Sequence, residues 1–348
     1  MSTSSAVAIT TEAPDLAALT EAIAEDSRYI DQLRQATGQV IVGQHDLIQK
    51  LLIAMLSNGH VLLEGVPGLA KTMTVDTLAH LIGTRFQRIQ FTPDLLPADL
   101  IGTLIYNPKE GTFEVKRGPI FTNIVLADEI NRSPAKVQSA LLEAMQERQV
   151  TIGTDTFPLP KPFMVMATQN PIEQEGTYPL PEAQLDRFFF KLEVGYSNRE
   201  ELSEIVNRTT AGDQPEIQQV LDGPTILAHQ KLIRRVIVAP HIQDYAVRLV
   251  LATHPGGDLA PPVVNQFLRF GASPRAAQAL ILAGKVRALL EGRANVSAED
   301  VRTMVLPAMR HRLLLNFEGE AEGMSTDTIL QNIVDTLPVD VGVAAGVA

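Results

Sequence analysis

The chain has 348 residues, of which 45% are hydrophobic, so it is long enough to form two domains with packed cores. It contains no cysteine, which excludes disulfides and thiolate metal sites, and its seven histidines do not show the spacing of a transition-metal site. The formal net charge of −11 argues against a large sequence-independent grip on nucleic acid.

The N-terminal segment, residues 1–35, is expected to be a polar tail followed by a helix. Its first 14 residues are rich in serine, threonine and alanine, and they lack the basic and apolar parts of a signal peptide. No apolar run in the chain is long enough to span a membrane. We therefore expect a cytoplasmic protein with no membrane span.

A short apolar run then precedes a glycine- and proline-rich loop that ends in Lys71 and Thr72. The order predicts a strand, a phosphate-binding loop and a helix, because Gly65 and Gly68 let the backbone approach phosphates and the helix N-terminus faces them. Lys71 would contact the β- and γ-phosphates, and the Thr72 hydroxyl would bind Mg²⁺. Ala70 replaces the second glycine of the strict pattern. A glycine turn followed by a surface lysine therefore stays open as an alternative.

The elements on either side of this loop follow from periodicity. Apolar residues at helical spacing predict a helix over residues 46–57, and a second helix is expected over residues 72–81. Residues 86–91 predict a short strand.

A proline-punctuated insertion comes next, over about residues 94–118. Residues 103–106 and 112–116 flank a turn sequence and predict a β-hairpin. Four apolar residues have no obvious element to bury them: Leu95, Leu96, Leu100 and Ile101. They are either an exposed contact surface for a partner or packed against the insertion's own hairpin.

An acidic pair follows the apolar run 123–127, which predicts a parallel strand buried on both faces with Asp128 and Glu129 at its carboxyl end. Asp128 would hold Mg²⁺, and Glu129 would orient and deprotonate the attacking water. Acids at strand ends also cap helices, but a preceding phosphate loop favours the catalytic interpretation. Asn170 follows another predicted strand, 163–168, and would hydrogen-bond this water or the γ-phosphate, or only form an Asn–Pro turn.

A helix over residues 134–147 and a fifth strand over residues 188–194 complete an alternation that predicts an α/β fold with a doubly wound sheet. From residue 198 onward only helical patterns occur, with capping signals at Asn198 and Ser297. We therefore expect a core over residues 36–195 and a helical domain over residues 196–348 that ends in a frayed tail.

Two arginines could supply the extra cations that a phosphoryl-transfer transition state requires. Arg187 directly precedes the fifth predicted strand, and Arg275 begins a helix of the second domain. One could contact a neighbouring subunit's nucleotide and the other could let the helical domain close on bound nucleotide. A surface ion pair is the alternative for each.

Together these motifs resemble those of the MoxR-family AAA+ ATPases. The resemblance extends from about residue 42 to residue 315, and it rests on segments 65–72, 126–132, 140–147, 167–178, 181–188 and 271–276. The family itself has alanine at the Ala70 position. The resemblance implies an AAA+ P-loop core, with a parallel sheet sandwiched by helices, and a smaller all-helical lid domain.

The resemblance also implies the functional residues. Those expected to hold ATP or ADP are Val42, Gly43, Gln44, Gly65, Val66, Pro67, Gly68, Leu69, Ala70, Lys71, Thr72 and Asp128. Of these, residues 42–44 would flank the adenine, and Thr72 and Asp128 would bind Mg²⁺. The implied catalytic residues are Glu129 as the base, Asn170 as sensor 1, Arg187 as an arginine finger acting in trans, and Arg275 as sensor 2.

Three functions are compatible with these residues. The first is an ATP-driven, chaperone-like remodeller that forms a homo-oligomer, expected to be a hexameric ring. In this family such proteins act with a von Willebrand factor A domain protein on a client, often in metal-cofactor insertion or maturation. The second is a nucleic-acid-dependent AAA+ motor, which the acidic balance disfavours. The third, a nucleotide-gated scaffold without hydrolysis, is disfavoured by Glu129, Asn170 and Arg187.

Overall fold

The computed structural model describes residues 28–65, 71–170, 176–210 and 218–339. Five of the predicted loop residues, Val66, Pro67, Gly68, Leu69 and Ala70, lie outside the described residues, as do most of the predicted N-terminal tail and the last nine residues of the predicted C-terminal tail. None of the helices within the described ranges combines the length and hydropathy needed to cross a bilayer.

The centre of the fold is a five-stranded sheet in the order β2-β5-β8-β1-β9, with every neighbouring pair parallel. Its strands are β1 (Val61–Glu64), β2 (Phe86–Gln90), β5 (Ile124–Asp128), β8 (Met164–Gln169) and β9 (Phe190–Glu193). All five were predicted from the sequence. The interior strands β1, β5 and β8 are almost wholly buried, as expected for a parallel sheet covered on both faces.

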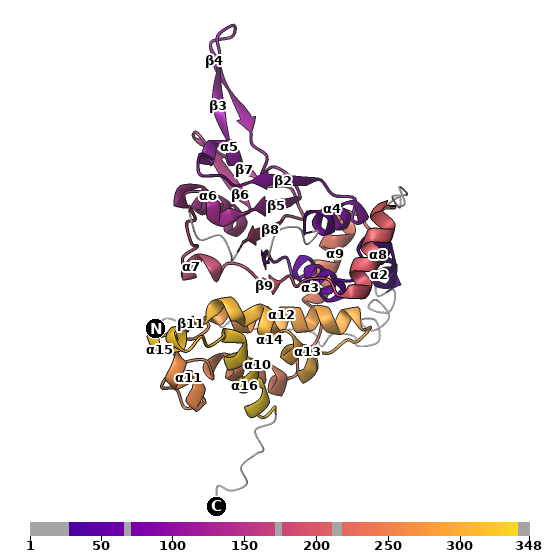
Figure 1. The fold of residues 1–348 in the computed structure, drawn as a ribbon. Coiled ribbons are helices and arrows are strands. Elements are labelled where there is room, and N and C mark those ends of the chain that lie inside the picture. The colour runs from indigo at the N-terminus through magenta and orange to yellow at the C-terminus, as the bar shows by residue number, and fades with distance from the viewer. Residues whose placement is uncertain (1–27, 66–70, 171–175, 211–217, 340–348) are drawn as a thin grey trace, which may run out of the picture.

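Alternate side chains of these strands enter two different cores. Val61, Leu63 and Leu126 pack with α3 (His45–Leu56) and α4 (Lys71–Leu81). Leu62, Val125 and Ala127 pack on the other face with α6 (Ala135–Glu147). Helices therefore lie on both sides of the sheet, with α4 and α6 well separated in Figure 1. This arrangement confirms the predicted α/β fold.

The insertion forms α5 (Pro97–Ile101) and the predicted hairpin of β3 (Gly102–Asn107) and β4 (Thr112–Arg117). The hairpin projects from the body of the molecule (Figure 1). The proposed contact surface on the insertion's first part is largely wrong, because Leu100 is fully buried and Leu95 and Ile101 pack beside it in the core under α6. Leu96 alone of the four is exposed, at 61%.

A second hairpin, β6 (Gln149–Ile152) and β7 (Asp155–Pro158), was not predicted. It follows α6, where Arg148 adopts a left-handed conformation that ends the helix. The strands have only four residues each, too few for a clear alternation of apolar and polar side chains.

Helices dominate the chain after residue 198. They are α8 (Arg199–Thr210), α9 (Gly223–Ile233), α10 (Pro240–Leu251), α11 (Pro262–Phe267), α12 (Pro274–Leu290), α13 (Ala298–Thr303), α14 (Val305–Met309), η2 (Arg310–Arg312), α15 (Phe317–Ala321) and α16 (Thr326–Thr336). The predicted caps at Asn198 and Ser297 are both present as reciprocal capping boxes. The cap at Ser297 does not open one long helix, because the chain breaks at Met304 into α13, α14 and η2.

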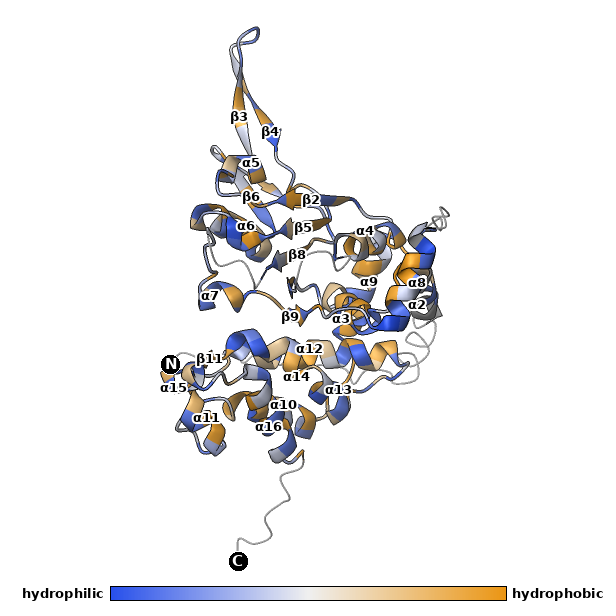
Figure 2. Ribbon diagram, viewed as in Figure 1, coloured by the Kyte–Doolittle hydropathy of each residue, from blue (hydrophilic) through white to orange (hydrophobic). Residues whose placement is uncertain are grey.

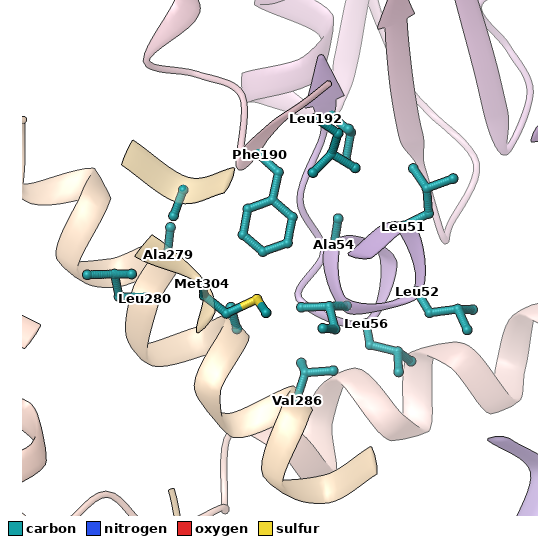
Figure 3. Close-up of a cluster of buried hydrophobic side chains, with 14 of the residues drawn as sticks. Leu51, Leu52, Ala54, Leu56, Phe190, Leu192, Ala279, Leu280, Val286 and Met304 are labelled. Carbon is teal, nitrogen blue, oxygen red and sulfur yellow. The ribbon is translucent and has the colours of Figure 1, made fainter. Parts of the chain in front are cut away.

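One short ribbon interrupts this helical lid: β10 (Leu268–Phe270) pairs with β11 (Leu314–Leu315). The lid packs directly on the edge of the core, as Figure 3 shows for Phe190 of β9, which lies near Ala279 of α12 and Met304. Side chains of α3 belong to the same continuous cluster. The lid and the β9 edge of the sheet therefore share one hydrophobic core.

Candidate nucleotide site

Three neighbouring strands bring the predicted site residues to one edge of the sheet. Gly65 follows β1, Asp128 ends β5, and Asn170 follows β8, which lies between β1 and β5. Because all three strands are parallel, their carboxyl ends share this edge, where ligands bind in open α/β sheets. Lys71 and Thr72 are the first residues of α4, which follows β1.

The Lys71 ammonium points into this edge. Its Nζ donates a hydrogen bond of 2.6 Å to the carbonyl oxygen of Gly65. Partial burial lowers the pKa of Lys71, while the negative charges of Asp128, Glu129 and Glu64 oppose that shift. The lysine therefore faces the acids across the space that follows β1, as a phosphate-binding cation would.

The Asp128 carboxylate is held from two sides. Thr168 Oγ1 donates to Asp128 Oδ1 at 2.6 Å, and Arg88 donates to Asp128 Oδ2 from Nη2 at 2.5 Å and from Nε at 3.0 Å. Thr168 also accepts a hydrogen bond of 2.8 Å from the backbone N–H of Glu129. One buried hydroxyl thus fixes the position of Asp128 and the backbone of Glu129 together.

Glu129, the residue directly after β5, has a left-handed backbone conformation. Its φ of 57° is left-handed, a conformation that costs a non-glycine residue about 1–2 kcal/mol. Its carboxylate accepts a 2.7 Å hydrogen bond from Gln90 Nε2 and lies 3.2 Å from Arg132 Nε. The general base expected from the sequence is therefore oriented by two polar partners.

Four partners of the acids were missed in the sequence: Arg88, Gln90, Arg132 and Thr168. Arg88 and Gln90 are two residues apart on β2, so their side chains lie on the same face of the sheet. Two polar residues at this spacing, on the strand that pairs with β5, are the sequence signal that could have identified them. Because β2 pairs with β5 in register Gln90↔Asp128, both side chains reach the acids from the neighbouring strand.

Residues 42–44, expected to flank the adenine, form the turn between α2 (Arg28–Val40) and α3. Gly43 and Gln44 both have a positive φ, of 67° and 55°. Gln44 Nε2 donates to the carbonyl oxygen of Gly195 at 3.5 Å, so the turn lies beside the connection to α8. Asn170 is 8% exposed at the end of β8.

The two arginines come from two segments of the chain that contact each other. Arg187 sits between α7 (Glu182–Leu185) and the amino end of β9, beside a small pocket that Glu143 and Glu147 of α6 also line. Arg275, in the first turn of α12, has its Nη1 3.6 Å from Asp186 Oδ2. The structure therefore brings Arg275 next to the Arg187 segment, and places Arg187 at the amino side of the sheet.

The donor set at the acidic edge fits a nucleotide with a divalent cation. The Asp128 carboxylate and Thr72 hydroxyl are the oxygen ligands that Mg²⁺ prefers, and Lys71 supplies a cation for phosphate. When bound, Mg²⁺ would neutralise charge on the β- and γ-phosphates. Arg88 donates a hydrogen bond to the Asp128 carboxylate, so Mg²⁺ would share this carboxylate with Arg88.

Comparisons with known proteins show which family the chain resembles. Residues 60–190 match the family model of the ATPase family associated with various cellular activities (AAA), and residues 262–333 match that of an AAA lid domain. Chaperone MoxR1 of Mycobacterium tuberculosis is 46% identical over 91% of this chain and 84% of its own length. Protein MoxR of Methylorubrum extorquens is 31% identical over 86% of this chain and 92% of its own. A crystal structure of a candidate ATPase from Cytophaga hutchinsonii superposes with a TM-score of 0.87 at 45% identity, covering 94% of this chain and 99% of that one.

Proposed function

The chain belongs to the MoxR family of AAA ATPases, and we propose that it uses Mg²⁺-dependent ATP hydrolysis to remodel a client protein. The observation that carries the hydrolytic part is that three parallel strands end at one edge: Gly65, which accepts a hydrogen bond from Lys71, follows β1, and Asp128 ends β5 on the other side of β8. This arrangement supports assigning Lys71 as the phosphate-binding cation, Asp128 as the metal carboxylate and Glu129 as the base.

Each residue has a defined task in this proposal. Lys71 binds the β- and γ-phosphates, while Thr72 and Asp128 hold the metal ion. Glu129 accepts the proton of the attacking water, and Asn170 orients that water or the γ-phosphate. Gln90 and Arg132 both contact Oε2 of Glu129, so in this proposal the other oxygen, Oε1, accepts the proton while these two contacts keep the carboxylate oriented.

We further propose that the active unit is a ring, with six subunits as the family resemblance suggests. Support comes from Arg187, which lies toward the amino side of the sheet, away from its own chain's acids. An arginine finger contributes about 10³ to 10⁵ in rate, so a finger that cannot reach its own site would need to serve a neighbour's.

The proposed partner is a protein, with a von Willebrand factor A domain protein and its client as the candidates. Four apolar side chains are exposed on the β3–β4 hairpin: Leu104, Ile105, Tyr106 and Phe113. The rings of Tyr106 and Phe113 pack on each other with centroids 5.3 Å apart, and apolar stretches mark both strands in Figure 2. An exposed apolar surface of this kind suits protein contact better than phosphate contact.

The experiment combines turnover with partner capture. ATP hydrolysis is expected with Mg²⁺ and is expected to stop when EDTA removes it. The Glu129→Gln variant, loaded with ATP, should retain partner proteins that the wild type releases. Tight, steeply salt-dependent binding to DNA with stimulated turnover would instead favour the nucleic-acid motor.

A further inference from the structure

Asp186, the residue directly before Arg187, collects three side chains of the lid. Ser273 Oγ donates to its Oδ1 at 2.7 Å, and Arg312 Nε donates to the same oxygen at 2.9 Å. The Nη1 atom of Arg275 lies 3.6 Å from the other oxygen. One core carboxylate therefore joins the N-cap of α12 and the end of η2.

Arg312 also holds the backbone on both sides of Arg187. Its side chain is only 3% exposed, and its Nη2 donates to the carbonyl oxygens of Asp186 at 3.3 Å and Phe188 at 2.8 Å. Nη1 donates to the carbonyl oxygen of Phe189 at 3.4 Å. Burial lowers the pKa of Arg312 to about 10, and the Asp186 charge opposes this shift, so the guanidinium is protonated at neutral pH.

A second lid residue, His311, adds to this hold on the same segment. Burial lowers the pKa of His311 well below its usual range, so its ring is neutral at pH 7. Its Nε2 lies 3.0 Å from the carbonyl oxygen of Phe188, which fits a hydrogen bond donated by the neutral ring. By contrast, the Arg187 guanidinium forms no ion pair with any residue that the structure describes. The backbone of this arginine is held by the lid while its side chain stays available.

We propose that Asp186 is a positioning residue, through which a subunit's own lid sets where Arg187 is presented to the neighbouring subunit. This inference rests on the proposed trans role of Arg187. The lid helices that carry Ser273, Arg275 and Arg312 are thus coupled to catalysis in the next site around the ring, through one carboxylate in the core.

The first test is Asp186→Asn, which keeps the shape of the side chain and removes its charge. Turnover should fall roughly 10- to 100-fold, because small misplacement of a catalytic group costs up to about 100-fold. Affinity for ATP should fall less than turnover, because Asp186 contacts Arg275, the implied sensor 2, but lies at the amino side of the sheet, away from its own chain's acidic edge. Asp327→Asn is the matched control, because Asp327 pairs with Arg310 of η2 at 2.6 Å without touching the Arg187 segment. It should leave turnover unchanged.

The decisive test is complementation in mixed rings. Asp186→Asn should recover activity when mixed with Glu129→Gln, because some interfaces then combine an intact base with a well-placed finger. It should recover none when mixed with Arg187→Ala, because every finger in such rings is defective. A residue needed only for its own subunit's folding or nucleotide site would give no recovery with Glu129→Gln.

Asp186→Glu keeps the negative charge that pairs with buried Arg312 but moves it by one methylene. If Asp186→Asn melts at a much lower temperature, Asp186→Glu tests instead whether the position of this carboxylate sets turnover. Recovery with Arg187→Ala, or full turnover by both Asp186 variants, would overturn the inference. The proposed function fails separately, if Arg187→Ala alone keeps the wild-type rate.

Discussion

The acidic edge of the sheet and the β3–β4 hairpin differ in how their side chains are satisfied. At the acidic edge, Asp128 and Glu129 each have partners on neighbouring strands, and buried apolar residues lie behind them. On the hairpin, Tyr106 and Phe113 are 54% and 68% exposed and contact mainly each other. The acidic edge therefore fixes the positions of two carboxylates. The hairpin, in contrast, leaves apolar side chains exposed to solvent.

Contacts at the base of the hairpin stabilise its two strands. A two-stranded hairpin is marginal by itself in water, so it needs support from the body of the protein. Arg117 supplies it, with its guanidinium 5.0 Å from the ring centre of Phe121 and 5.3 Å from that of Phe157. Gly102 begins β3 with a φ of 105°, where a side chain would strike the carbonyl oxygen of Lys116. The tip is therefore free to contact a partner because the base alone is anchored.

Within the acidic edge, the largest expected effect is that of Glu129→Gln, which removes the base without changing the shape of the side chain. Turnover should fall by about 10² to 10⁴, the range for a general base, while ATP binding is kept. Steady-state phosphate release and binding of a fluorescent ATP analogue measure the two. Glu114→Gln makes the same change on the hairpin and should leave turnover unaltered. A Glu129→Gln protein that hydrolyses ATP at the wild-type rate would show that the base is another group.

Lys71→Ala should weaken ATP binding roughly 10- to 100-fold, because a hydrogen bond to a charged group contributes about 1.5–3 kcal/mol. The loss should appear in equilibrium titration with the analogue. Lys50→Ala removes a surface lysine paired with Asp46 and serves as control. Unchanged affinity for ATP in Lys71→Ala would contradict the phosphate assignment.

Thr168→Val keeps the volume of the side chain but leaves the Glu129 N–H and an Asp128 oxygen without this hydroxyl. The free energy of unfolding should fall by about 1–3 kcal/mol and turnover by roughly tenfold. Thr122→Val is matched, because Thr122 is also buried and its hydroxyl donates to the carbonyl oxygen of Arg85 at 2.9 Å. Thr122→Val should lose stability without a specific loss of turnover. If both variants lost turnover equally, Thr168 would have no specific role in positioning the acids.

The smallest effect on turnover is expected on the hairpin. Tyr106→Ser combined with Phe113→Ser should leave basal ATP hydrolysis within about twofold, since surface changes rarely alter stability by more than about 0.5 kcal/mol. Stimulation by a partner, or its capture by the Glu129→Gln trap, should be lost. Lys109→Ser at the turn between the strands should keep both. Loss of basal turnover in the double variant would contradict the view that the hairpin contributes to partner contact and not to hydrolysis.

Sequence reasoning found the fold because its evidence is local. The interior strands β1, β5 and β8 are short apolar runs, the acids stand at the carboxyl end of β5, and the loop lysine begins the helix that follows β1. The insertion leucines were misjudged because their burial depends on α6, which comes later in the chain. The apolar residues on the hairpin looked like ordinary strand residues, although Leu104, Ile105, Tyr106 and Phe113 are exposed.

The partners of the acids could not be predicted either. Arg88 and Gln90 reach them only because β2 lies next to β5, and Thr168 only because β8 does on the other side. The Asp186 cluster joins residues 126 positions apart in the case of Arg312. No local pattern in the sequence carries such contacts.

In the proposed ring, a complete hydrolytic site needs the acidic edge of one subunit and Arg187 of another. The most direct measurement mixes Arg187→Ala with Glu129→Gln, each inactive alone, and follows ATP hydrolysis in rings shown to contain both variants. Some interfaces then pair an intact Glu129 with an intact Arg187, so activity should reappear on mixing. Mixed rings as inactive as either parent would contradict a site shared between subunits.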